Sequence, residues 1–160
     1  MPSELIAPLL LSIVFVVAAA AAVATRRATL TSANILRIGC VTLVLQALHA
    51  SEEFFFGFHE RFPMLFGLAP WSAGFFVSFN LVWLVLWSLS LTAVGSGRIS
   101  MAPRTLLWFL ALAAFVNGFV HPLLSVLTGS YFPGTLSAIP LGVAGMLLIG
   151  RLNGQMPSPR

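Results

Sequence analysis

Five long apolar runs, separated by short polar stretches, make up most of the chain. They extend from about Leu5 to Ala24, Ile35 to Phe58, Trp71 to Val94, Thr105 to Leu127 and Gly134 to Gly150. A helix needs roughly 20 predominantly apolar residues to cross the hydrocarbon core of a bilayer, and only the fifth run is clearly shorter than that. The pattern therefore predicts an all-α fold, a polytopic membrane bundle of five transmembrane helices.

Composition supports the same prediction. Of the 160 residues, 59% are hydrophobic and only 8% are charged, whereas a soluble domain of this size needs a far more charged surface. We expect residues 1–160 to form a single domain embedded in a lipid bilayer. The first run is expected to be retained, because no Lys or Arg precedes it and because it exceeds the roughly 7–15 apolar residues of a signal peptide.

The arginines predict an orientation. With five spans, seven of the eight fall on one side, and only Arg61 falls on the other; the seven are Arg26, Arg27, Arg37, Arg98, Arg104, Arg151 and Arg160. The positive-inside rule then places the N-terminus outside and the C-terminus in the cytoplasm of a multi-pass protein, in a bacterial-type cytoplasmic membrane. The arginines form no basic stripe, so we expect no nucleic-acid partner.

The stretch "LQALHASEE" brings ionisable residues into the second run. His49, Glu52 and Glu53 are three and four residues apart, which places them on one helical face, and Gln46 extends this face by one turn. Three phenylalanines at 54–56 continue the apolar run beyond the carboxylates, so we place the cluster inside the membrane. Ionisable residues at that depth are costly and usually mark a functional site.

A second polar group lies in the fourth run, within "FVNGFVHPLL". Asn117 and His121 share a face, and Pro122 frees a backbone carbonyl one turn earlier. At 1.5 Å per residue, Glu52 and His121 each lie about 25 Å from the cytoplasmic ends of their helices, so the two groups are expected to meet in the outer half of the bilayer. Asn80 would lie somewhat deeper, and the loop "TGSYFPGT" would close over the site.

Three short motifs occur in order: "HASEE" at 49–53, "NGFVH" ending at residue 121, and "YFPG" at 131–134. Together they resemble the HXXEE-domain family of small integral membrane proteins, and the resemblance covers nearly the whole chain. That family is of uncharacterised function, so the resemblance implies no particular activity. It does imply a set of site residues: His49, Glu52, Glu53, His121, Tyr131, Pro133 and Gly134.

Two histidines and one carboxylate are a common catalytic zinc set, and the same set suits non-haem iron. We therefore expect His49, His121 and one glutamate, Glu53 or Glu52, to hold a divalent metal, zinc or iron. The other glutamate would be the general base for a metal-bound water. The expected function is a hydrolase-type reaction on a lipid or isoprenoid-like substrate.

The remaining candidates would support that chemistry. Tyr131 would donate a hydrogen bond to a developing oxyanion, which makes it a catalytic candidate together with the two glutamates. Gln46, Asn80 and Asn117 would contact the hydrophobic substrate, and Asn117 would also orient His121.

Two other functions remain open. Paired carboxylates with a histidine are adequate for a metal-free isomerase or cyclase, and Glu–His chains also carry protons or cations in transporters or in subunits of membrane complexes. The almost wholly apolar cytoplasmic halves of the spans disfavour transport. At the outer end of the second run, His59, Glu60 and Arg61 are expected to be solvated, with Glu60 pairing with Arg61.

Overall fold

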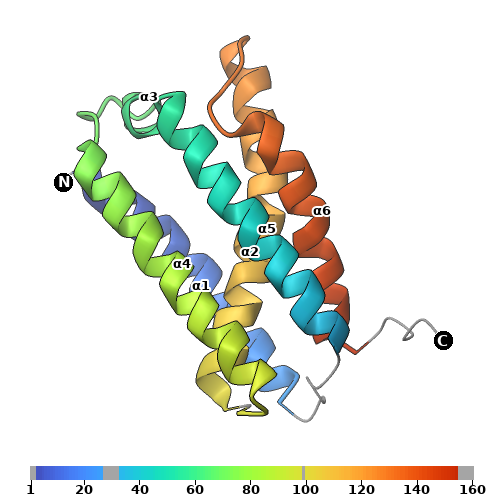
Figure 1. Ribbon diagram of the computed structural model, residues 1–160. Coiled ribbons are helices and arrows are strands. Elements are labelled where there is room, and N and C mark those ends of the chain that lie inside the picture. Colours follow the sequence, from blue (N-terminus) through green and yellow to red (C-terminus); the bar gives the residue numbers. More distant parts are fainter. Residues whose placement is uncertain (1–2, 27–32, 99, 155–160) are drawn as a thin grey trace.

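The computed structural model describes residues 3–26, 33–98 and 100–154, and all regular structure within them is helical. A single 3₁₀ turn, η1 (Ser3–Leu5), precedes six α-helices (Figure 1): α1 (Ile6–Ala24), α2 (Ala33–Phe55), α3 (Phe58–Met64), α4 (Ala73–Gly95), α5 (Met101–Thr128) and α6 (Thr135–Leu152). Every one of these except α3 is long and apolar enough to cross a membrane. The predicted all-helical, five-span architecture of a multi-pass membrane protein is confirmed.

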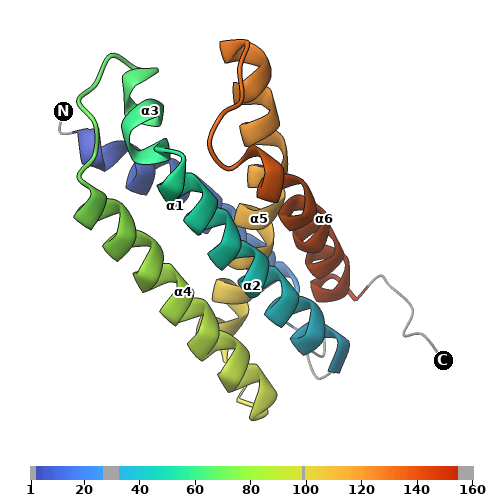
Figure 2. The ribbon, with the colours of Figure 1, turned by 45° about the horizontal axis from the view of Figure 1, so that its top comes forward.

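Helix α5 is the centre of the bundle. It packs against α1, α4 and α6, while α2 packs on α6 and α4 (Figures 1 and 2). The α5 and α6 backbones approach closely where two glycines meet, because a Cβ added to Gly118 would lie 2.7 Å from the Cα of Gly142. The buried Ala138 belongs to the same stripe of small residues, which lets the two backbones approach closely.

The predicted end of the second span is wrong. Helix α2 stops at Phe55, and Gly57 adopts φ +78°, a left-handed conformation that interrupts the helix before α3 begins. The sequence "HERFP" therefore forms most of a separate short helix and is not the solvent-exposed end of α2. The apolar run hid this break because phenylalanines continue on both sides of the glycine.

Two further helix starts differ from the expected ones. Helix α4 begins two residues after Trp71, where the Ser72 hydroxyl caps it by accepting a hydrogen bond of 3.1 Å from the Phe75 amide. Helix α5 begins four residues before Thr105 and so includes Arg104 in its first turn. Instead of lying in a loop, that arginine is buried and donates to the Thr25 carbonyl at 2.8 Å, at the end of α1.

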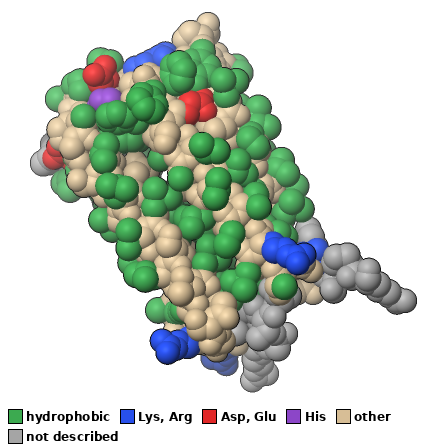
Figure 3. Space-filling view, viewed as in Figure 1, with side chains coloured by type: hydrophobic (Ala, Val, Ile, Leu, Met, Phe, Trp, Pro, Cys, Tyr) green, Lys and Arg blue, Asp and Glu red, His purple; other side chains and the backbone are tan. Residues whose placement is uncertain are grey.

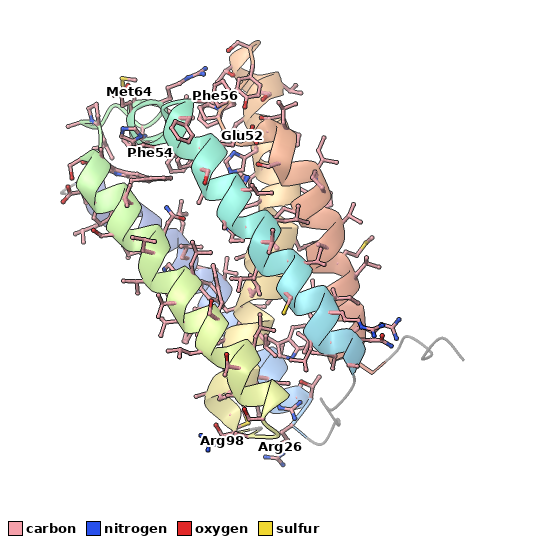
Figure 4. All side chains as sticks on the ribbon, viewed as in Figure 1. Arg26, Glu52, Phe54, Phe56, Met64 and Arg98 are labelled. Atoms are coloured by element: carbon pink, nitrogen blue, oxygen red, sulfur yellow. The ribbon has the colours of Figure 1, made fainter. Side chains whose placement is uncertain are left out.

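The interior has two apolar clusters, one toward each end of the bundle. The larger one, with Trp87, Trp108 and Phe109, lies toward the end that carries Arg26 and Arg98 (Figure 4). An aromatic cluster lies toward the opposite end, and its buried members are Phe62, Trp71, Phe76 and Phe132. The polar site described below lies beside the aromatic cluster.

The surface agrees with a lipid environment. On the face shown in Figure 3, the middle of the bundle carries no Arg, Asp or Glu, and charged side chains gather toward the two ends. Arg26 and Arg98 lie at the end opposite to Glu52 (Figure 4), as the predicted sidedness requires, whereas Arg27 and Arg160 lie outside the described residues. Which end faces the cytoplasm stays a prediction.

Candidate metal centre and its cavity

Three predicted metal ligands converge between α2 and α5. The Nε2 atoms of His49 and His121 lie 3.6 Å and 3.3 Å from the same carboxylate oxygen, Oε1 of Glu53. The two imidazole rings are nearly perpendicular, with centroids 4.6 Å apart. All three residues are buried, and one potential ligand atom from each lies within 4.8 Å of the other two.

Hydrogen bonds to the other ring nitrogens orient both histidines. Nδ1 of His121 lies 2.6 Å from the Pro133 carbonyl, which can only accept, so this nitrogen carries a proton. Nδ1 of His49 lies 2.9 Å from the Ser137 hydroxyl, which itself donates to the Gly134 carbonyl at 3.4 Å and can therefore accept from the imidazole. Assigned from this network, each neutral histidine presents the lone pair of Nε2 to Glu53.

The turn before α6 covers the histidines. Gly134 has φ +92°, and a Cβ at this position would lie 2.6 Å from Nδ1 of His121 and 2.8 Å from Cε1 of His49. Only glycine allows the backbone to approach both imidazoles in this conformation. The predicted closure of the "YFPG" turn over the site is confirmed.

This arrangement is suited to a cation. Two imidazole lone pairs and a carboxylate oxygen face one another, and Nε2 of His49 is buried with no hydrogen-bond partner in the described part of the chain. Ligand atoms around a tetrahedral zinc lie roughly 3.3–3.4 Å apart when the bonds are about 2.0–2.1 Å long. The two measured separations from Glu53, 3.3 Å and 3.6 Å, are close to that spacing.

Glu52 lies apart from this cluster. Its carboxylate accepts from the backbone amides of Leu136 at 3.1 Å and Ser137 at 2.8 Å, at the N-terminus of α6, and from the hydroxyl of Tyr131. A carboxylate there is stabilised by the unpaired amides and the helix dipole. The structure thus brings Glu53, but not Glu52, together with the two histidines.

Tyr131 likewise contacts Glu52 instead of the histidines. Burial first, and then the hydrogen bond to Glu52, raise the pKa of Tyr131 to about 12, so its hydroxyl stays protonated at neutral pH. The side chain is 37% exposed and does not line the cavity beside the metal ligands. Its predicted role as an oxyanion donor stays a prediction that this geometry does not favour.

The three predicted substrate-binding residues line one cavity of about 300 Å³, and Glu53 and His121 also line it. Gln46 is buried, and its Oε1 atom has no hydrogen-bond partner among the described residues. Asn80 donates to the Phe76 carbonyl at 3.0 Å. Asn117 does not orient His121 as expected, because the Pro133 carbonyl does so instead.

Of the predictions for residues 59–61, two are wrong: the solvation of His59, and the pairing of Glu60 with Arg61, whereas Arg61 itself stays partly exposed. The His59 side chain is only 12% exposed and packs against the rings of Phe54 and Phe76, with centroid separations of 5.6 Å and 5.8 Å. Arg61 does not pair with Glu60; its Nη1 atom donates to the Tyr131 carbonyl at 3.0 Å, and its guanidinium lies 5.2 Å from the Phe132 ring centroid. Both residues belong to α3, which the α2 break creates, so His59 packs on the aromatic rings while Arg61 reaches the turn before α6.

Sequence reasoning missed two groups at this site. Ser137 supports His49, and Phe58 covers His121 with a ring-centroid separation of 5.3 Å. Serine is common in membrane helices and phenylalanine is abundant in this chain, so residue type alone carried no signal. Their roles follow from the turns at Gly57 and Gly134, which no hydrophobic pattern reveals.

Comparisons of the chain with family models, with curated proteins and with solved structures found no match. The resemblance to the HXXEE-domain family stays a prediction. Any function must therefore follow from the cluster of His49, Glu53 and His121 and from the apolar cavity beside it.

Proposed function

We propose that this protein is a membrane-embedded enzyme that holds a divalent cation between His49, Glu53 and His121 and hydrolyses a lipid or isoprenoid-like substrate. One observation carries the proposal: three lone-pair donors converge inside the membrane, and both histidines have their other nitrogen engaged elsewhere. Such a donor set is repulsive unless a cation lies within it. Two histidines and one carboxylate leave a coordination position open for substrate or water.

The residues divide the work of hydrolysis as follows. A bound divalent cation supplies a Lewis acid. Oε1 of Glu53 serves as a ligand, while Oε2, which makes no hydrogen bond within the described residues, accepts a proton from the attacking water. Water oxygen bonds to the carbonyl or phosphoryl centre, the bond to the leaving oxygen breaks, and Glu53 passes the proton to that oxygen, which gives an acid and an alcohol.

The cavity supports the choice of substrate. Most of its wall is aromatic and aliphatic, and the amides of Gln46, Asn80 and Asn117 supply a few polar groups. Ligand sites typically have this composition, with polar groups fixing the orientation of an otherwise apolar molecule. A hydrophobic substrate with one or two hydrogen-bonding groups fits such a cavity.

A metal-free acid–base enzyme, an isomerase or cyclase, is the second candidate. The 3.3 Å separation between His121 and Glu53 favours it, because a proton in place of a metal would also satisfy these two atoms. The glutamate pair expected to perform this chemistry is split, since Glu52 caps α6. Transport is disfavoured by the apolar cluster toward the opposite end of the bundle, around Phe109.

Metal content tests the proposal directly. Purified full-length protein, grown with supplementary zinc or iron, should contain close to one ion per chain by elemental mass spectrometry. His49→Ala, His121→Ala and Glu53→Gln should each reduce occupancy to roughly a tenth or less, because each removes a direct ligand. Glu52→Gln and His59→Ala are matched controls, of the same residue types outside the cluster, and should retain the ion.

Activity separates the two candidates. Membrane lipids from cells that express the wild type should contain an acid and an alcohol whose combined mass exceeds that of a depleted lipid by one water, and Glu53→Gln cells should lack both. A wild-type protein without metal, or a turnover that survives exhaustive chelation, would contradict the metal-assisted mechanism and favour the metal-free enzyme.

A further inference from the structure

The end of the cavity nearest the polar loops is closed by aromatic side chains. Phe62, Trp71 and Phe76 are buried there, and the indole nitrogen of Trp71 donates to the Ser3 carbonyl at 2.7 Å. This hydrogen bond ties the loop before α4 to the start of the chain. On that side packed aromatic rings border the cavity, which disfavours the entry of a polar solute from the water.

A second cavity lies on the outer side of the α1–α4 seam. Its volume is about 220 Å³, and it is lined by Pro8, Leu11, Ser12, Phe15, Phe79 and Trp83. Leu11, Phe79 and Trp83 also line the larger cavity. The two spaces therefore adjoin each other at these three residues.

The seam itself is loosely packed. Helix α1 packs chiefly on α5, and α4 packs on α5 and α2, so α1 and α4 meet mainly through side chains. The ring of Phe15 lies 6.5 Å from that of Trp83, and Phe79 lies 6.4 Å from Trp83. Aromatic side chains, which can change rotamer, therefore form most of the contact at the point where the two spaces adjoin.

The lining of the second cavity, which is a groove between α1 and α4, is apolar. Of its six lining residues only Ser12 and Trp83 carry a polar side-chain atom, and the Ser12 hydroxyl donates to the Leu9 carbonyl at 2.7 Å within α1. Helix α1 is the most apolar candidate span, with a mean hydropathy of 2.7. In a bilayer, the material in contact with this groove is lipid hydrocarbon.

We propose that the groove between α1 and α4 binds one hydrocarbon chain of a membrane lipid, and that this chain reaches the larger cavity past Leu11, Phe79 and Trp83. The inference rests on the proposed function only for the chemistry at the cavity that the chain reaches. The cavity of about 300 Å³ is at the lower end of the roughly 300–1,000 Å³ of small-molecule sites, so the proposal concerns one hydrocarbon chain and not two.

Photolabelling tests the route. The full chain is reconstituted in phosphatidylcholine vesicles with a trace of phosphatidylcholine that carries a diazirine on one acyl chain, irradiated, and mapped by mass spectrometry. Labels should be enriched at Leu11, Phe15 and Trp83 over Val44 and Leu48, which are 59% and 57% exposed on the lipid-facing side of α2. Equal labelling of both sets, or no labelling of the seam, overturns the proposal.

A pair of variants sharpens the test. Ser12→Trp fills the groove and should abolish the enrichment at the seam, whereas Ile13→Trp adds the same ring at a neighbouring position outside it and should leave the enrichment unchanged. Seam labelling that persists in Ser12→Trp contradicts the groove. If Ser12→Trp does not fold, the photolabelling of the wild-type protein alone tests the proposal.

Metal content separates this inference from the proposed function. Ser12→Trp should retain its ion, because Ser12 lies outside the cluster of His49, Glu53 and His121. Seam labelling in a wild-type protein that lacks metal supports the groove and contradicts the metal enzyme. Full metal content without seam labelling supports the metal enzyme and contradicts the groove.

Discussion

Gly134 is the residue on which the site geometry depends most directly. It combines a left-handed backbone, with φ +92°, and contact with both histidines at distances too short for any side chain. The same residue precedes α6, so the position of the turn over the histidines and the start of that helix are fixed together. A change at Gly134 should therefore affect the metal site before it affects the rest of the bundle.

Gly134→Ala should lose the metal. The added Cβ would force His121 or His49 away from Glu53, and the left-handed φ alone costs about 1 kcal/mol for a non-glycine residue. Gly129→Ala is the matched control: its φ is also left-handed, at +64°, but nothing lies within 4 Å of its Cβ position. Elemental mass spectrometry should find the ion in Gly129→Ala only. A fully loaded Gly134→Ala variant would contradict the geometry of the site.

Residue spacing predicted the cluster but could not distinguish between the two glutamates. At about 100° per residue, Glu52 lies about 60° to one side of His49 and Glu53 about 40° to the other, so both share its face. The choice is made by tertiary packing, because α6 starts on the Glu52 side and offers free amides there. No local pattern in the second run contains that information.

At the scale of elements, α2 and α6 are joined through Glu52. The carboxylate of one helix caps the N-terminus of the other, and Tyr131 donates a hydrogen bond to it from the connecting turn. From α3, Arg61 holds the same turn through the Tyr131 carbonyl. These contacts keep the turn over the histidines without touching the ligands themselves.

Tyr131→Phe should destabilise the protein by about 1 kcal/mol at neutral pH, since it removes a hydrogen bond to a charged group at a partly exposed position. The pKa of Tyr131 is raised from 10.0 to about 12, so the folded state favours the protonated hydroxyl. This contribution is fully present below pH 10 and is lost as the pH rises toward 12. Thermal unfolding in detergent should show a constant difference from pH 6 to about pH 9 that narrows above pH 10.

The metal content of Tyr131→Phe is the control for this experiment. The substitution should loosen the turn but leave His49, Glu53 and His121 able to bind the ion. The phenyl ring also retains the contact with Phe56, whose centroid lies 5.4 Å from that of Tyr131. A difference in stability that does not change with pH would show that the hydroxyl is not the cause.

The spans were more predictable than their ends. Length and hydropathy are enough to identify a helix that must satisfy its own backbone in lipid, and all five were found on that basis. Helix α3 was not predicted, because it depends on the positive φ of Gly57 within an unbroken aromatic run. The burial of His59 and the contact of Arg61 with the Tyr131 carbonyl were missed for the same reason, since their helical faces are defined only after the break at Gly57.

For the whole molecule, polarity is arranged along the bundle axis. The histidines, Glu53 and the cavity lie toward one end, with the apolar cluster around Trp108 and Phe109 toward the other. The bundle is therefore asymmetric along its axis, with the cluster of His49, Glu53 and His121 toward one end. If the proposed enzyme activity holds, the orientation decides which leaflet supplies its substrate.

Cysteine accessibility should show the site end outside and the arginine end in the cytoplasm, because seven of eight arginines fall on the latter side. Cys40, the only cysteine, is first replaced by Ala, and then Ser130→Cys and Ser96→Cys are made separately at exposed positions toward the two ends. A membrane-impermeant maleimide added to intact cells should label Ser130→Cys, and should label Ser96→Cys only after permeabilisation. The reverse pattern would place the His–Glu site in the cytoplasmic leaflet, and lipids of that leaflet would then be its source of substrate.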